Sequence, residues 1–168
     1  MLITPLLLGL ACGGTHPACT CFPGPPLTSR AAVAAVANGS AAVFEGTVVR
    51  AVHPGPGPGA PVPDLVVTLA VRRQWKGAPA KTITVRTAPA TESCGVRFVE
   101  GRTYVVFAGT PDYSGVGVAR PARAREVVYA NKCSPTTAVG AESQRIVSLL
   151  GPPLAAGAAA PPSDGPEA

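Results

Sequence analysis

Two cysteines one residue apart, in Cys19-Thr20-Cys21, are the residues with the clearest potential for chemistry in this chain. A proline-rich turn over residues 22–26 follows them, and the remaining downstream cysteines are Cys94 and Cys133. A disulfide between Cys19 and Cys21 would close a strained ring, so both are expected to pair with the two distant cysteines. Two arrangements satisfy this, and each closes a long loop that the chain-entropy model values at about 4 kcal/mol. The sequence therefore predicts two disulfides that tie the N-terminal segment to the body.

Zinc binding is the alternative chemistry for the same thiols. Cys19 and Cys21, together with His16, could ligate a metal ion. Structural zinc sites usually combine two closely spaced pairs of ligands, whereas Cys94 and Cys133 each stand alone in the sequence. The spacing favours disulfides, and we expect no cofactor and no metal bound by the protein alone.

The fifth cysteine, Cys12, ends the apolar run 6–12 and is followed by Gly13-Gly14. This pattern resembles a bacterial lipoprotein signal that ends in a lipobox, which makes Cys12 a candidate for lipidation. An ordinary cleaved signal that discards Cys12 is the alternative, and no Lys or Arg precedes the run. The run is too short to span a bilayer permanently, so membrane contact is expected only through a lipid anchor.

Both interpretations predict an export signal and spacer over residues 1–18. We therefore expect an extracytoplasmic protein, either secreted or anchored to the membrane as a lipoprotein. Such compartments allow disulfides to form, which agrees with the use of the other four cysteines.

Charge and motif content argue against two classes of function, nucleic-acid binding and catalysis. The net charge of +5 comes from scattered arginines, not from a basic block interleaved with aromatic residues, so nucleic-acid binding is not expected. His16 and His53 lie in proline-rich surroundings, and the sequence contains no nucleophile elbow, zinc-protease helix motif or phosphate-binding loop. We expect a monomer that binds a protein partner and is not an enzyme.

Hydrophobic periodicity places short strands between two helices. The first helix is expected over 31–37 with Thr28 or Ser29 as its N-cap, and the second over about 137–150 with Ser134 or Thr136 as its N-cap. Residues 151–168 are rich in Pro, Ala and Gly and are expected to be a disordered tail. Alternation or continuous apolar character predicts strands over 42–52, 65–75, 82–87 and 103–108, with weaker strand patterns over 116–119 and 126–130.

Three of these strands carry more specific signals. Gly46 interrupts the first strand at a position suited to a bulge. Leu65, Val67, Leu69 and Val71 share one face of the second strand, so that face is expected to be core. The run 103–108 is apolar almost throughout, which is typical of a strand buried on both faces.

Five or so short strands with a helix at each end predict a mainly β fold. The expected architecture is an OB-fold-like, five-stranded Greek-key barrel over residues 19–150, with a short N-terminal helix and a C-terminal helix, stapled by disulfides.

Several short motifs follow one another along the chain: Cys19-Thr20-Cys21, the proline-rich turn, the short helix, Phe44-Glu45-Gly46-Thr47-Val48, Trp75-Lys76-Gly77, Ser93-Cys94-Gly95 and Tyr104-Val105-Val106-Phe107-Ala108. Their order and approximate spacing resemble the netrin-like module found in tissue inhibitors of metalloproteinases (TIMPs). The resemblance covers about residues 19–150 and implies that Cys19 pairs with Cys94 and Cys21 with Cys133. Asn38 stands where a further cysteine of the animal inhibitors would fall, and their second domain has no counterpart here.

The resemblance implies a specific function for the first of these motifs. In the animal inhibitors the first cysteine of the motif is the mature N-terminus, and its free α-amino group and carbonyl chelate the zinc of a protease. Carried over, Cys19 would chelate the zinc and Thr20 would enter the specificity pocket of a metalloendopeptidase.

This function requires cleavage between Ala18 and Cys19, and His16 stands where a signal peptidase prefers a small side chain. If Cys12 is the lipidated terminus, the nitrogen of Cys19 is an amide with no lone pair for zinc. The alternative is a non-inhibitory, extracytoplasmic netrin-like module that binds a protein or is structural, in which Cys19 and Cys21 act only as staples.

Overall fold

The computed structural model describes residues 19–21, 26–55, 64–110 and 128–154. The described part is mainly β with two helices, as predicted. The expected strand over 116–119, the export segment with Cys12 and His16, and residues 155–168 lie outside it. The elements follow in the order α1 (Arg30–Gly39), β1 (Ala42–Val52), β2 (Leu65–Lys76), β3 (Thr82–Thr87), the 3-10 turn η1 (Thr91–Ser93), β4 (Thr103–Ala108), β5 (Val128–Tyr129), β6 (Thr137–Ala138) and α2 (Ala141–Leu150).

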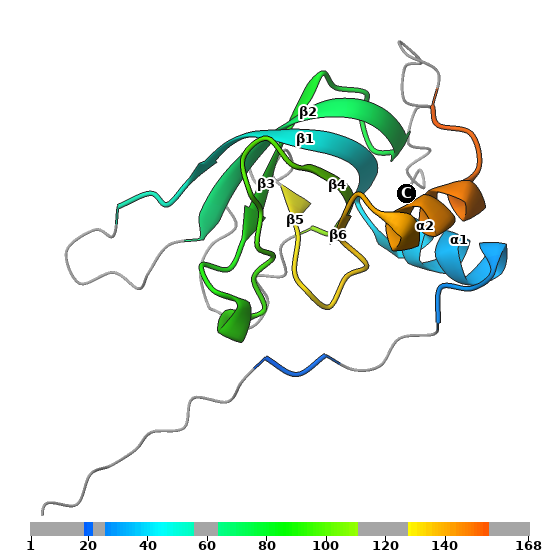
Figure 1. The fold of residues 1–168 in the computed structure, drawn as a ribbon, viewed down its shortest axis with the longest axis horizontal. Coiled ribbons are helices and arrows are strands. Elements are labelled where there is room, and N and C mark those ends of the chain that lie inside the picture. The colour runs from blue at the N-terminus through cyan, green and yellow to red at the C-terminus, as the bar shows by residue number, and fades with distance from the viewer. Residues whose placement is uncertain (1–18, 22–25, 56–63, 111–127, 155–168) are drawn as a thin grey trace, which may run out of the picture.

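The strands form one curled, mixed sheet with the order β5-β3-β2-β1-β4-β6 (Figure 1). The pair β3 and β5 is parallel, whereas the other neighbours are antiparallel. Beyond the end of β4, the backbone N–H of Gly109 donates to Tyr129 at 2.9 Å and that of Tyr129 donates back at 2.8 Å. This pair of bonds joins β4 to β5, so the curl brings opposite parts of the sheet together.

Within the described residues the sheet has six strands where the sequence predicted about five, and β6 is the strand that was not expected. The hydroxyl of Thr136 accepts from the N–H of Phe107 at 3.0 Å and donates to its carbonyl at 3.3 Å. These two bonds hold the chain beside β4 just before Thr137, so residues 137 and 138 pair with it. The pattern of the sequence did not reveal this because it depends on one side chain and on two residues of strand.

The long strand β1 pairs with β2 on one side and with β4 on the other. Its register with β2 shifts between Glu45 and Gly46, which confirms the predicted bulge. A β-carbon at Gly46 would lie 3.0 Å from the carbonyl oxygen of Ala70 and 3.1 Å from the β-carbon of Leu69. Glycine therefore lets the two strands approach closely where β1 bends.

Two apolar cores lie on opposite faces of the sheet. The inner core is enclosed by the curl, and Phe44 and Leu69 are its largest fully buried members. The outer core lies between the sheet and the helices, and contains Val33 of α1 and Ile146 of α2. The predicted inward face of β2 is confirmed, because Leu65, Val67, Leu69 and Val71 all contribute to the inner core.

Strand β4 connects the two cores, as its continuous apolar run predicted. Tyr104, Val106 and Ala108 face the inner core, and Val105 and Phe107 face the outer one. All five are buried, with exposed fractions of 4% or less. The strand is thus covered on both faces.

The helices α1 and α2 lie side by side against one end of the sheet (Figure 1). Ser29 is the N-cap of α1, as predicted, and its side chain accepts from the N–H of Ala32. The prediction for the second helix was wrong at its start, because residues 137 and 138 belong to β6. Its N-cap is Gly140 instead of Ser134 or Thr136, and the Ser143 hydroxyl bonds both the N–H and the carbonyl of Gly140.

Trp75 and Lys76, at the end of β2, attach both helices to the sheet. The ammonium of Lys76 donates to the carbonyls of Ala37 and Asn38 at the end of α1. The indole of Trp75 donates to the carbonyl of Gly151, just after α2. The expected tail begins at residue 151, yet the chain stays attached to the sheet as far as Leu154, whose N–H donates to the carbonyl of Gln74. Among the described helices, none has the length and apolar character needed to cross a bilayer.

Candidate functional site

The segment Cys19-Thr20-Cys21, here called the strap, is bonded at both of its cysteines to turns that connect the strands. Cys19 pairs with Cys94, with 5.1 Å between their α-carbons. Cys21 pairs with Cys133, with 5.2 Å between their α-carbons. Of the two arrangements that the spacing left open, the structure has the one that the netrin-like resemblance implies.

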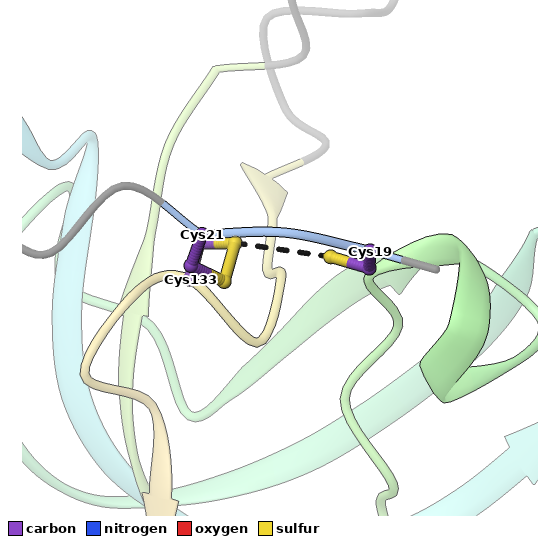
Figure 2. A group of neighbouring side chains, drawn as sticks. All are labelled: Cys19, Cys21 and Cys133. Carbon is purple, nitrogen blue, oxygen red and sulfur yellow. Dashed lines mark hydrogen bonds between the residues drawn. A yellow bond between two sulfur atoms is a disulfide. The ribbon is translucent and has the colours of Figure 1, made fainter. Parts of the chain in front are cut away.

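The two disulfides touch each other. The sulfur of Cys19 lies 3.9 Å from the sulfur of Cys133, the approach drawn as a dashed line in Figure 2. Because both sulfurs belong to disulfides, neither carries a proton, and the approach is a van der Waals contact. The sulfurs of Cys19, Cys21 and Cys133 all lie within 4.8 Å of one another. The fold thus gathers cysteines that the sequence keeps far apart.

A tight turn after η1 presents Cys94 to the strap. Cys94 has a left-handed backbone, with φ 68°, and its N–H donates to the carbonyl of Thr91. The N–H of Gly95 donates to the carbonyl of Ala90 at 2.8 Å. A β-carbon at Gly95 would lie 2.1 Å from the carbonyl oxygen of Ala88, so only glycine fits without a shift of the backbone. The motif Cys94-Gly95 is therefore a requirement of this turn.

A second turn, independent of the strap, presents Cys133. The side-chain oxygen of Asn131 accepts from the N–H groups of Cys133 and Ser134, both at 2.9 Å. The N–H of Lys132 donates to the carbonyl of Cys94 at 2.9 Å, which joins the two cysteine-bearing turns. Sequence reasoning did not assign these roles, although an Asn two residues before a cysteine is the pattern of an Asx-turn. Hydrogen bonds of the backbone, to the side chain of Asn131 and between the two turns, thus set the positions of Cys94 and Cys133.

The nitrogen of Cys19 is itself hydrogen-bonded. As a peptide N–H it donates to the carbonyl of Glu92 at 2.9 Å. An amide nitrogen in this state has no lone pair to give a metal ion. Thr20, between the two bridged cysteines, is exposed. The structure therefore places Cys19, the predicted zinc chelator, beside η1 with its nitrogen as an amide. Thr20, the predicted pocket residue, lies at the surface.

An open cavity of about 350 Å³ lies beside this turn. Leu65 and Phe98 give it an apolar wall, while His53, Glu92 and Arg97 bring charged or ionisable groups to it. Glu92 is also the residue whose carbonyl holds Cys19. Glu92 of η1 therefore contributes both to the cavity and to the attachment of the strap.

Comparison of the chain with protein-family models and with curated proteins finds no match. The netrin-like resemblance stays a prediction.

Proposed function

We propose that the chain is an extracytoplasmic, netrin-like protein-binding module in which the strap and η1 form the contact surface. Its specific form is a TIMP-like inhibitor that binds the zinc of a metalloendopeptidase. One observation carries the proposal: a segment of three residues is fixed by a disulfide at each end and exposes the residue between them. A segment held in this way is pre-organised, so little conformational entropy is lost when a partner binds it.

The strand pairing supports an OB-type barrel as the scaffold. Following neighbours from β1 through β2, β3 and β5 leads, by the bonds between Tyr129 and Gly109, to the end of β4, which pairs with β1 again. These five strands make a closed circuit, and β6 lies outside it. A partly open, five-stranded Greek-key barrel is the OB architecture, and its loops commonly form the binding surface.

The chemistry of the nitrogen of Cys19 decides between inhibitor and non-inhibitory module. If processing made Cys19 the first residue, its neutral amine would have two N–H bonds and a lone pair. One N–H could keep the bond to the carbonyl of Glu92, and the lone pair would be available to zinc together with the carbonyl of Cys19. If residues remain before it, the nitrogen stays an amide, and the strap can act only by its shape and side chains.

The test compares two chains that differ by one residue. A chain that begins at Cys19 is expected to inhibit a zinc endopeptidase, and the same chain with one alanine in front is not. Loss of a direct zinc ligand should change the inhibition constant by orders of magnitude, since each 1.4 kcal/mol is about tenfold. Equal inactivity against a broad panel of zinc proteases would refute the inhibitor form and leave the binding or structural module.

Export and anchoring are tested separately. If Cys12 carries lipid, the protein partitions into detergent, and Cys12→Ser releases it to the aqueous phase or leaves the signal uncleaved. A water-soluble wild type that begins at Cys19 would exclude the lipid anchor and at the same time favour the inhibitor. Intact mass of the exported protein distinguishes the two outcomes.

A further inference from the structure

We infer that the four strap cysteines, when reduced, form a binding site for one thiophilic divalent cation such as Zn²⁺ or Cd²⁺. The site consists of Cys19, Cys21, Cys94 and Cys133, which the oxidised protein uses in its two disulfides. This inference does not depend on the proposed function, because it concerns the protein's own thiols and not the metal of a partner.

The sulfur positions are close to those of a tetrahedral thiolate site. With zinc–sulfur bonds of about 2.3 Å, neighbouring sulfurs in such a site lie about 3.8 Å apart. The sulfurs of Cys19 and Cys133 are already 3.9 Å apart, and those of Cys19, Cys21 and Cys133 lie within 4.8 Å of one another (Figure 2). Cys94 is bonded to Cys19, so its sulfur is within about 6 Å of that of Cys133. Opening each disulfide to the tetrahedral spacing needs a movement of less than about 2 Å.

Half of the site is held in place without any disulfide. The bond from the N–H of Lys132 to the carbonyl of Cys94 joins the two turns that carry Cys94 and Cys133. Asn131 fixes the second turn by accepting from the N–H of Cys133. These turns are attached to a sheet whose two cores contain none of the four cysteines. Two thiols therefore remain near each other after reduction.

The strap supplies the other two thiols as a Cys-x-Cys pair. Cys19 and Cys21 need only stay close to the two turns, and the bond from Cys19 to the carbonyl of Glu92 favours this. Along the sequence Cys94 and Cys133 stand alone, which argued against a zinc site. In the fold the bond from Lys132 to Cys94 joins their turns, so the four thiols can supply the four ligands of a structural zinc site.

Metal can bind at this site only after both disulfides are reduced. A dithiol reductant transfers four electrons and four protons to the two disulfides and is itself oxidised to disulfides, which leaves four protein thiols. Binding of one divalent cation then releases the four thiol protons, because the ligands are thiolates. Reoxidation by a disulfide oxidant removes four electrons, restores both bridges and releases the cation. The metal site and the two disulfides therefore cannot exist at the same time, because they use the same four sulfurs.

The experiment uses the full chain, reduced by a phosphine without oxygen and titrated with Co²⁺. We expect the visible and charge-transfer bands of tetrahedral thiolate-bound cobalt, saturation at one ion per chain, and loss of the bands when Zn²⁺ is added. The oxidised protein is the first control and should show none of these bands. Replacement of Cys94 by serine should weaken binding about 100-fold or more, whereas Cys12→Ser should leave it unchanged.

A second measurement needs no variant, so a variant that fails to fold cannot confuse the result. Reduced wild type is alkylated with and without Cd²⁺, and the modified cysteines are identified by mass spectrometry. Protection of Cys19, Cys21, Cys94 and Cys133, with Cys12 modified, supports the site. Protection of fewer than these four, the same protection in denaturant, or cobalt binding of unchanged affinity in Cys94→Ser would overturn it.

Discussion

The strap and the curled sheet are held in place by different forces. The sheet is positioned by burial, since β1 pairs on both sides and Phe44, Leu69 and Val106 are fully buried. The strap contributes no residue to either core, and its residues are half-buried or exposed. Disulfides hold it at both cysteines. A segment positioned by covalent bonds can therefore stay in place without burying its central side chain.

Removal of a core side chain should have the largest effect on stability. We expect Phe44→Ala to lower the free energy of unfolding by about 3–5 kcal/mol, because it removes buried apolar surface and leaves a cavity. Urea denaturation followed by circular dichroism measures the change. The control is Val49→Ala on the same strand, whose side chain is 54% exposed and should change stability by about 0.5 kcal/mol or less. Equal losses at both positions would contradict the assignment of the core.

Removal of one disulfide as a pair of serines should have the next largest effect. We expect the double variant Cys21→Ser, Cys133→Ser to lose about 2–4 kcal/mol, because the unfolded chain gains conformational entropy. The matched variant Cys19→Ser, Cys94→Ser opens a loop of 75 residues instead of 112. Loop entropy alone makes the two losses differ by less than about 0.5 kcal/mol. A much larger difference would mean that contacts, and not the bridges, hold the strap.

The sequence predicted the parts of the fold that depend on periodic burial. The inward face of β2, the doubly buried β4 and the bulge at Gly46 all follow from the residues within single strands. It did not predict β6, because that strand depends on the hydroxyl of Thr136 reaching the backbone of Phe107 from 29 residues away. The start of α2 was therefore placed too early, since residues 137 and 138 belong to β6. Single contacts between distant segments leave no periodic signal.

The candidate site likewise has features that the sequence predicted and features that it did not. Spacing and the strain of a three-residue ring were enough to expect that the strap binds Cys94 and Cys133. The groups that position those two cysteines are the carbonyl of Thr91, the side chain of Asn131 and the N–H of Lys132. Two of these are backbone groups, which every residue type has, so no residue identity could reveal them.

The turn that carries Cys94 is the place where sheet and strap meet, and a change there should have an intermediate effect. We expect Gly95→Ala to cost about 1–3 kcal/mol, since the new β-carbon would lie 2.1 Å from the carbonyl oxygen of Ala88 and the backbone must move. Gly109→Ala is the control, because nothing lies within 4 Å of its added β-carbon. Thermal denaturation of both variants checks the prediction, and an unchanged midpoint for Gly95→Ala would show that the turn is not closely packed.

The smallest effect on stability is expected at Thr20, the exposed residue of the strap. Thr20→Arg should change the free energy of unfolding by about 0.5 kcal/mol or less, because the residue is exposed and its neighbours are fixed by disulfides. The same substitution at Thr87 is the matched control. Thr87 is fully buried on β3 and accepts a hydrogen bond from Val96 at 2.8 Å, so a charged side chain there should prevent stable folding.

A binding assay tests whether Thr20 contacts a partner, independently of its small expected effect on stability. If the strap is the contact surface, a chain that begins at Cys19 and carries Thr20→Arg should keep its thermal midpoint while its inhibition constants against a panel of zinc endopeptidases change in rank. A large, charged side chain at the contact favours pockets that accept it and disfavours small ones. If neither stability nor the pattern of binding changes, Thr20 does not contact a partner, and the cavity beside Glu92 and Arg97 becomes the surface to mutate next.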